Sequence, residues 1–323
     1  MIHALPEWPL FGVSDDARPA LRRSRLAGET LALATIAGLD GGGPRPVGTQ
    51  MTLAPSGVSG FLSGGCLEGD VATHARDMLQ DGVPRRLVYG QGSPWPDIRL
   101  LCGARIEVLL ERISPDDPAV GALLGLADRR APAVWISDGA RRVCADAGTP
   151  PAPWPDAFAR RFDPVPRLVV LGSDPTALAI ASLGAQSGCE TTLVRPRGPV
   201  EPPPLQGVAY RRDEPAEALA AIGLDPWTAV AVATHDAELD HAGLTAALPS
   251  PAFYVGALGA RRRLPDRQLW LRQSGVNEAN IARLRAPIGL DIGGKAPWEV
   301  AIAVLAEITE ARLRRAAVAE ATA

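Results

Sequence analysis

The sequence predicts an α/β protein of two domains, in which a small α/β (α+β) domain precedes a domain with a mainly parallel sheet. Its length of 323 residues suits two domains, because a typical domain has roughly 150 residues. Prolines are concentrated at residues 149–166, which is typical of a linker. From residue 167 onward, apolar strand patterns alternate with helical ones, as in a parallel sheet. We therefore expect domains at 1–148 and 167–323, joined by a linker at 149–166.

The overall composition predicts a cytoplasmic protein that neither binds nucleic acid nor inserts into a membrane. A net charge of −3 does not favour a nucleic-acid partner. No apolar run is long enough to span a bilayer, and residues 1–10 lack the basic start of a signal peptide. The four cysteines have no CxxC spacing, which suits a reducing compartment better than a disulfide scaffold. They are Cys66, Cys102, Cys144 and Cys189.

The first domain is expected to contain short elements, identified by alternation or by helical spacing of apolar residues. In chain order they are an arm or short helix at 1–22, a strand at 30–37, a hairpin from 51–53 and 58–62, a helix from residue 67, strands at 86–89 and 106–110, a helix at 115–127, and a hairpin at 133–145.

The centre of this domain is the stretch 61–70, where an apolar run ends in Ser-Gly-Gly-Cys and a helix begins. Two glycines before Cys66 allow a ligand to approach the backbone closely. A helix N-terminus lowers the pKa of a thiol, whereas the first-turn carboxylates of Glu68 and Asp70 oppose that effect. A tight turn with a buried, inert cysteine fits the pattern equally well.

Two further positions are candidates for the same site. Arg45 lies in a glycine-rich loop between two prolines, and it is either a bidentate anchor for phosphate or carboxylate or a solvated loop arginine. Cys102 and Gly103 precede the strand at 106–110, so the Cys102 thiol either converges with Cys66 on one site or is simply buried. Two cysteines alone do not make a zinc site, which needs about four ligands.

The second domain opens with a Rossmann-like pattern. A buried strand from residue 167 ends at Gly172, a helix runs through residue 188, and a second strand covers 190–194. Only Gly172 matches the glycine fingerprint, whereas a dinucleotide site requires three glycines. Arg195 stands where an NAD enzyme places an acidic ribose ligand. The pattern is therefore compatible with NAD(P) but does not favour it.

Polar and glycine-rich segments follow the next strands of this domain. The strand at 227–233 ends in Thr-His-Asp, the strand at 251–255 precedes glycines and an arginine run, and a glycine-rich loop at 286–294 precedes the last helix, which starts near Pro297. Open α/β sheets bind ligands at such strand ends, and glycines, arginines and a helix N-terminus favour anions. Helix capping is the alternative for the Thr-His-Asp triplet. The candidate anion or ligand site comprises Gly172, Asp174, Thr234, His235, Asp236, Gly256, Gly259, Arg261, Arg262, Gly289 and Asp291.

Ordered motifs in both halves resemble those of the XdhC/CoxI family, over nearly the whole chain after residue 26. In the first half these are Gly43-Pro-Arg45-Pro-Val-Gly48 with Gln-Met at 50–51, Ser63-Gly64-Gly65-Cys66-Leu-Glu68-Gly, and Leu-Cys102-Gly103. In the second half they are Thr234-His235-Asp236, the segment 254–263, and Pro-Ile-Gly289-Leu-Asp291-Ile-Gly.

The chain departs from the family pattern at four places. Ala104 replaces the second glycine after Cys102, and the Gly-x-Gly-His-like turn reads Gly172-Ser-Asp-Pro. Ala237 and Arg285 stand where the family often has histidine. The loss of polar groups in the second half puts a nucleotide or metal role of that domain in doubt.

The resemblance implies a maturation chaperone for molybdenum hydroxylases such as xanthine dehydrogenase, rather than an enzyme, and no catalytic residue is expected. Such a factor binds the molybdenum cofactor, in its molybdopterin form or as a nucleotide derivative, and protects it. A cysteine desulfurase sulfurates the cofactor, and the apo-hydroxylase then receives it. The resemblance also implies a homodimer.

The resemblance implies that the cofactor is held in the first domain, at residues of the family motifs. These are Arg45, Ser63, Gly64, Gly65, Cys66, Glu68, Cys102 and Gly103. Cys66 and Cys102 are the candidate neighbours of molybdenum, because thiolates are soft ligands. The alternatives are an NAD(P)-dependent oxidoreductase that uses the second domain, and a cofactor-free scaffold for hydroxylase assembly.

Overall fold

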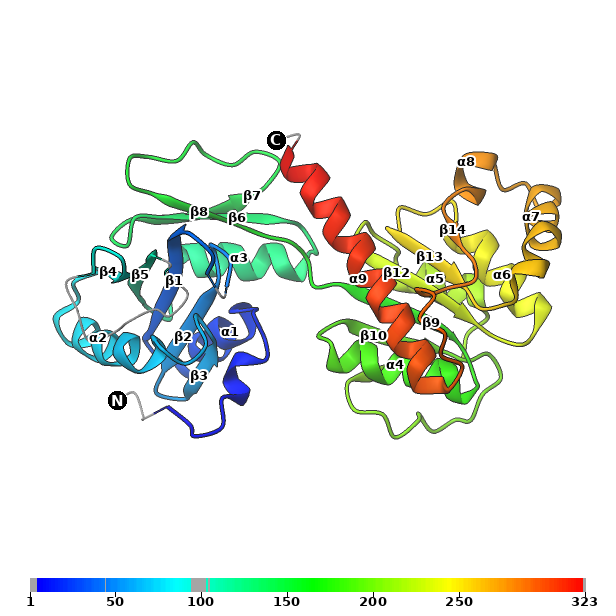
Figure 1. The fold of residues 1–323 in the computed structure, drawn as a ribbon, viewed down its shortest axis with the longest axis horizontal. Coiled ribbons are helices and arrows are strands. Elements are labelled where there is room, and N and C mark those ends of the chain that lie inside the picture. Colours follow the sequence, from blue (N-terminus) through cyan, green and yellow to red (C-terminus); the bar gives the residue numbers. More distant parts are fainter. Residues whose placement is uncertain (1–4, 44, 94–102, 104, 322–323) are drawn as a thin grey trace. The chain divides into compact units, whose positions relative to one another are not determined.

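The computed structural model describes residues 5–43, 45–93, 103 and 105–321, and side chains through residue 316. The chain forms two compact units, Met1–Pro164 and Val165–Ala323 (Figure 1). The first unit contains a five-stranded sheet of order β3-β2-β1-β5-β4 and a three-stranded sheet of order β7-β6-β8. Its elements are η1 (Leu10–Gly12), α1 (Arg18–Ala27), β1 (Leu31–Asp40), β2 (Gln50–Ala54), β3 (Gly57–Gly60), α2 (Glu68–Asp81), β4 (Arg85–Gly90), β5 (Arg105–Ile113), α3 (Pro118–Asp128), β6 (Ala133–Ser137), β7 (Arg142–Asp146) and β8 (Phe158–Phe162).

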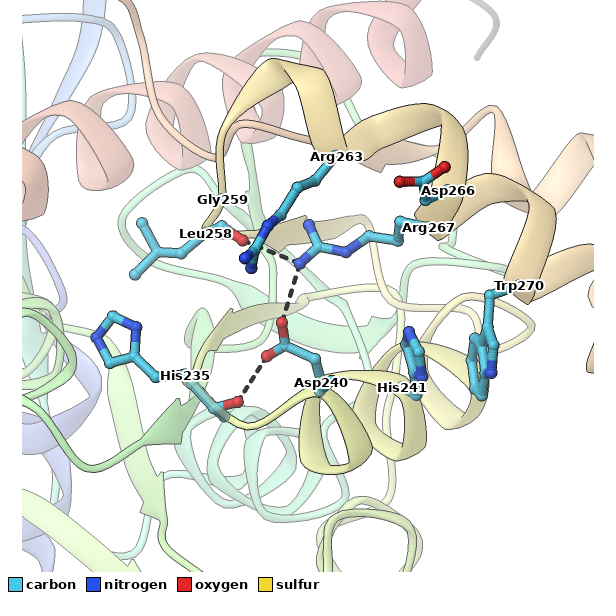
Figure 2. A pocket seen from close by; sticks show the side chains of 11 residues that line it. His235, Asp240, His241, Leu258, Gly259, Arg263, Asp266, Arg267 and Trp270 are labelled. Atoms are coloured by element: carbon cyan, nitrogen blue, oxygen red, sulfur yellow. Dashed lines mark hydrogen bonds and ion pairs between the residues drawn. The ribbon is translucent and has the colours of Figure 1, made fainter.

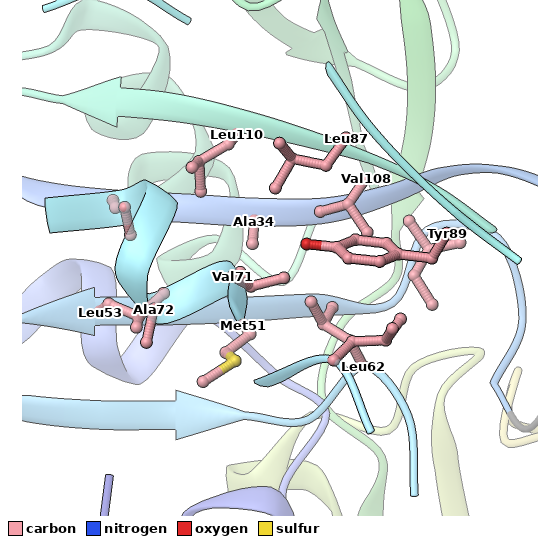
Figure 3. Packing of buried hydrophobic residues seen from close by; sticks show 14 of the residues in the cluster. Ala34, Met51, Leu53, Leu62, Val71, Ala72, Leu87, Tyr89, Val108 and Leu110 are labelled. Carbon is pink, nitrogen blue, oxygen red and sulfur yellow. The ribbon is translucent and has the colours of Figure 1, made fainter. Parts of the chain in front are cut away.

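Helix α2 forms because its apolar residues recur at helical spacing, and it packs that face against the antiparallel five-stranded sheet. Val71 and Met78 of α2 are fully buried in the same cluster as Met51 of β2 and Val108 of β5. Figure 3 shows the Tyr89 ring inside this cluster. The helix therefore has a fixed position on the sheet, and so does the turn that precedes it.

A buried polar network joins the two sheets of the first unit. The Arg142 guanidinium on β7 pairs with Glu111 of β5 at 3.2 Å and with Asp117 at 2.6 Å. Glu111 is fully buried and Asp117 is 6% exposed. The Ser137 hydroxyl donates to Glu111, and Asp117 caps α3 by accepting from the Ala119 N–H at 2.9 Å. The Arg142 guanidinium therefore helps to hold together β5, β6, β7 and the start of α3.

The second unit contains a six-stranded sheet of order β11-β10-β9-β12-β13-β14, in which all the strand pairs are parallel. Helices α4 and α9 pack on one face, and α5, α6 and α7 on the other. This arrangement confirms the predicted α/β class with a mainly parallel sheet. The elements are β9 (Arg167–Gly172), α4 (Pro175–Gln186), β10 (Glu190–Val194), β11 (Val208–Arg211), α5 (Pro215–Ile222), β12 (Thr228–Ala233), α6 (Ala237–Ala247), β13 (Tyr254–Ala257), η2 (Arg261–Arg263), α7 (Leu264–Gln273), α8 (Glu278–Ile281), β14 (Leu284–Arg285) and α9 (Pro297–Ala321).

The segment 149–166, expected to be a linker, contains strand β8. This strand pairs antiparallel with β6, and Phe162 at its end is 5% exposed in the core of the first unit. The division between the units falls after Pro164. Because prolines lie on both sides of β8 and are typical of a linker, the composition of this segment did not predict the strand.

Within the described residues, no helix is both long enough and apolar enough to cross a membrane.

Candidate functional site

The turn before α2 is closed by the carboxylate of Glu68, which is only 2% exposed. Its Oε1 accepts from the N–H groups of Leu62 at 2.9 Å and Ser63 at 2.6 Å. Its Oε2 accepts from the Ser63 hydroxyl at 2.8 Å and from the Leu67 N–H at 3.2 Å. The Ser63 oxygen in turn accepts from the Cys66 N–H at 3.1 Å. Glu68 and Ser63 therefore bind the turn itself, and contact between them and a cofactor stays a prediction.

The same turn exposes its tip, which consists of Gly64, Gly65 and Cys66. Gly65 has a φ of +99°, in the left-handed region that favours glycine. A Cβ added to Gly64 or Gly65 would meet no atom of the described residues within 4 Å beyond the adjoining residues, so these residues leave open space on this side. Cys66 is exposed, so the alternative of a buried cysteine is wrong, whereas the reactivity of its thiol stays a prediction.

The start of α2 adds partial positive charge beside this thiol. The N–H groups of Glu68, Gly69 and Asp70 lie in the first helical turn, where no intrahelical acceptor exists. Such a helix end favours a bound anion. The arrangement can therefore present a soft sulfur ligand together with hydrogen-bond donors.

Asp70 points toward the sheet, where it accepts from the Tyr89 hydroxyl at 2.7 Å. His74 lies one turn later, with its Nε2 3.5 Å from the same Asp70 oxygen. Burial, and then the bond to Asp70, raise the pKa of Tyr89. Asp70 therefore anchors α2 to β4.

The other predicted cofactor residues of the first unit have different surroundings. Arg45 forms an ion pair with Asp15, so it is not a freely solvated loop arginine. Gly103 is exposed with a φ of +69°. Cys102 lies outside the described residues, so its convergence with Cys66 stays a prediction. No group of three or more potential metal ligands occurs in the part of the chain that the structure describes.

In the second unit, the crevice between β9 and β12 is where a Rossmann domain binds a nucleotide. Here Asp174 caps α4 by accepting from the Ala177 N–H at 2.8 Å, and its second oxygen lies 2.9 Å from His235 Nε2. A carboxylate thus occupies the helix end at which a pyrophosphate would bind. A Cβ on Gly172 would lie 2.4 Å from the Ala233 carbonyl oxygen, so this glycine serves close packing. The geometry argues against a dinucleotide at this place.

A cavity of 490 Å³ lies beside the ends of β12 and β13 (Figure 2). Arg267 donates to Asp240 at 2.9 Å and to the Leu258 carbonyl at 3.1 Å, and the Thr234 hydroxyl donates to Asp240 at 2.7 Å. Burial raises the pKa of Asp240, whereas Thr234 and Arg267 act against this. The polar groups of Arg267, Asp240 and Thr234 in the cavity wall are thus paired with one another.

The cavity contains both predicted and unpredicted residues. Of the predicted candidates, Thr234, His235 and Gly259 line it. Arg263, which ends the arginine run noted in the sequence, also lines it. Lining residues that were not predicted from the sequence include Asp240, Arg267, His241 and Trp270, the last two stacked with ring centroids 3.4 Å apart. The spacing of 263, 267 and 270 places those three on one helical face, a signal that was available in the sequence.

The remaining predicted residues of this unit have separate structural roles. Asp236 caps α6 by accepting from the Glu238 N–H at 2.9 Å, as the capping alternative predicted. Arg261 pairs with Asp291 at 3.1 Å, where both side chains are exposed. A Cβ on Gly256 would lie 2.6 Å from Ile288, and the Gly289 N–H donates to Glu307 at 2.7 Å, while Arg262 is exposed. Convergence of all eleven candidates on one anion site stays a prediction.

Comparison with known proteins decides the family. The family models described as "XdhC Rossmann domain" and "XdhC and CoxI family" match residues 168–308 and 24–90. The molybdenum cofactor insertion chaperone PaoD of Escherichia coli (strain K12) is 32% identical over 308 residues, which are 94% of this chain and 91% of PaoD. The chain belongs to the XdhC and CoxI family. This membership confirms the resemblance carried by the motifs.

Two further proteins are similar to this XdhC and CoxI family member. A Bacillus subtilis (strain 168) protein described as a probable xanthine dehydrogenase subunit is 26% identical over 335 residues, covering 90% of this chain and 96% of that protein. A solved structure described as a xanthine dehydrogenase from Bacillus halodurans has a TM-score of 0.75 and 22% identity, covering 93% and 96% of the two chains. That structural likeness shows a shared fold.

Proposed function

We propose that this chain is a maturation chaperone that binds the molybdenum cofactor at the Cys66 turn and delivers it to an apo-hydroxylase of the xanthine dehydrogenase type. The observation that carries the proposal is the exposed Cys66 thiol, held by a turn that the buried Glu68 carboxylate closes. The relative PaoD also supports the proposal, because its name describes a molybdenum cofactor insertion chaperone. A turn built for exposure of one thiol suits reversible binding of a soft metal centre.

The donor set at the turn fits this cargo. The Cys66 sulfur is a soft ligand for molybdenum or a shield for its sulfido group. The backbone N–H groups at the start of α2 suit anionic oxygens. The open space beside Gly64 and Gly65 lets a flat pterin approach the backbone. Each residue binds or orients, and no bond in the cofactor needs to be broken by the chain.

The proposal includes a cysteine desulfurase that sulfurates the bound cofactor, a homodimeric assembly and a cytoplasmic location. Cys66, Cys144 and Cys189 are free thiols, which is what a reducing compartment maintains. The Asp174 carboxylate at the pyrophosphate position of the second unit favours a chaperone over an NAD(P)-dependent oxidoreductase.

A transfer experiment tests the proposed function. The chain is purified anaerobically from cells that make molybdenum cofactor and is mixed with a cofactor-free molybdenum hydroxylase. We expect hydroxylase activity to appear while the cofactor leaves the chain. The control is chain from cells that lack the cofactor, which should activate nothing. A loaded chain that activates the hydroxylase no better than free cofactor contradicts delivery, and a chain that never carries cofactor favours the scaffold alternative.

A further inference from the structure

A second feature of the first unit lies at the turn that ends in Gly48, where two arginines have buried nitrogens without a partner. Arg45 Nε and Arg160 Nη1 are both inaccessible to solvent, and neither has a hydrogen-bond partner among the described residues. Guanidinium groups are almost never buried without an acceptor, because desolvation of the charge is costly. Orphaned donors of this kind indicate that an acceptor binds here.

Arg160 is held firmly in this position by β8. Its guanidinium carbon lies 4.2 Å from the centre of the Phe162 ring. Its Cγ lies 3.7 Å from the point where Gly48 would carry a Cβ, so the arginine packs against the turn. Burial lowers the pKa of Arg160 to about 10, Asp16 acts against this lowering, and Arg18 adds to it. The surrounding residues therefore supply too little negative charge to balance the Arg160 guanidinium.

The carboxylates nearby are engaged with other arginines. Asp16 pairs with Arg18 at 2.9 Å, and Asp15 pairs with Arg45. Arg160 is the third guanidinium of the cluster, and its Nη1 has no hydrogen-bond partner among the described residues. The Asp15 side chain is 62% exposed, so an incoming anion can displace it from Arg45 with little desolvation. The cluster is built for an anion with several oxygens.

The arginine cluster is connected to the Cys66 turn by the N-terminal arm. Phe11 contacts Phe61, the first residue of that turn segment, with ring centroids 5.8 Å apart. Gly12 is pressed against the same ring, because its Cβ position lies 2.7 Å from Phe61 Cβ. Asp15 follows three residues later, and three extended residues span at most about 11 Å. The arm therefore places the arginine cluster and Phe61, which opens the segment leading to Cys66, in the same part of the first unit.

We propose that Arg45 and Arg160 bind the phosphate end of the molybdenum cofactor while its metal end lies at Cys66. This inference rests on the proposed function. A phosphate accepts from Arg160 Nη1, takes the place of Asp15 at Arg45, and supplies the missing negative charge. A phosphate monoester and a nucleotide pyrophosphate both offer this chemistry.

Calorimetry tests the site by measuring how tightly the full chain binds inorganic pyrophosphate and inorganic phosphate. The reference titration uses sodium chloride of equal ionic strength. The variant is Arg160→Gln, and Arg161→Gln is its control, because Arg161 is an exposed neighbour paired with Asp163. We expect Arg160→Gln to weaken anion binding at least about tenfold, and the control to change it less than about twofold. If the chain binds pyrophosphate more tightly than phosphate, the site suits a nucleotide form of the cofactor. If it binds phosphate more tightly, the site suits the phosphate monoester. A parent chain that binds neither anion, or an Arg160→Gln variant that binds like the parent, overturns the proposal.

Thermal unfolding separates an anion-binding role from a structural one. Without anion, Arg160→Gln should unfold at the same temperature as the parent or higher, because it removes a buried charge that lacks a counterion. Pyrophosphate should raise the unfolding temperature of the parent and leave that of the variant unchanged. An Arg160→Lys variant keeps the charge without the planar fork and should respond weakly. A lower unfolding temperature of Arg160→Gln, combined with an unchanged response to pyrophosphate, assigns Arg160 to packing on Phe162 and overturns the proposal.

Cofactor content distinguishes a failure of this inference from a failure of the proposed function. Loss of cofactor in both Cys66→Ser and Arg160→Gln supports the inference. If cofactor is lost in Cys66→Ser but retained in Arg160→Gln, the function stands and the phosphate assignment is wrong. If pyrophosphate binds through Arg160 while the parent never carries cofactor, the anion site exists but its assignment to the cofactor is wrong.

Discussion

Replacing Glu68 by glutamine is expected to lower the free energy of unfolding of the first unit by about 3 kcal/mol. The carboxylate accepts from two backbone N–H groups on one oxygen, and from a hydroxyl and a third N–H on the other. A glutamine NH₂ at the second oxygen's position would face the Leu67 N–H, so two donors would oppose each other. Hydrogen bonds to a charged group contribute roughly 1.5–3 kcal/mol each. Urea unfolding followed by circular dichroism measures the loss.

The same variant is expected to release the turn that presents Cys66. We predict a changed rate of reaction between the Cys66 thiol and a thiol reagent, together with reduced cofactor binding. The control is Glu107→Gln, because Glu107 is a half-buried carboxylate of the same unit whose partner is Arg105. Its substitution should cost less than about 1 kcal/mol. Equal stability of Glu68→Gln and the parent would show that the carboxylate does not hold the turn.

Replacing Arg142 by methionine is expected to destabilise the first unit by about 3–5 kcal/mol, because it leaves two buried carboxylates without their cation. Glu111 is fully buried and Asp117 nearly so, and both pair with Arg142. Loss of the pair also weakens the link between β5, β7 and the start of α3. Substitution of the exposed Arg112 by methionine is the matched control, and it should change the free energy of unfolding by less than about 0.5 kcal/mol.

The cost of Arg142→Met is expected to grow with pH. Burial raises the pKa of Glu111 above its ordinary value of 4.5, while Ser137 and Arg142 act against this. The folded state therefore keeps a proton that the unfolded state has released, so stability falls as pH rises above that ordinary value toward the raised one. Without Arg142 the pKa rises further, and the fall should extend to higher pH. Urea unfolding at several pH values checks this, and parallel stability curves for variant and parent would contradict it.

Much of the fold was predictable from the sequence because it depends on local periodicity. The strand pattern near residues 106–110, the helix that begins near Leu67, and the βαβ units after residue 167 all follow from apolar spacing. Strand β8 did not, because its pairing with β6 is a tertiary contact and the surrounding prolines are typical of a linker. Composition alone therefore placed the linker too broadly.

The candidate site was predictable in residue identity but not in geometry. The sequence placed Glu68 in the first helical turn, but it did not show that the side chain turns back on residues 62 and 63. Exposure of Cys66 follows from that fold-back. The contact between Arg160 and the turn at Gly48 joins positions more than a hundred residues apart, and no periodicity predicts such a contact.

The most direct test of cofactor binding at the Cys66 turn is the molybdopterin and molybdenum content of the chain. Parent, Cys66→Ser and Cys189→Ser proteins are purified anaerobically from cells that make the cofactor. Cys189 is the matched control because it is a half-buried free thiol of the second unit. We predict stoichiometric cofactor in the parent and in Cys189→Ser, and little in Cys66→Ser. Equal cofactor in all three proteins would contradict a site at the Cys66 turn, and its absence from the parent would contradict the chaperone function.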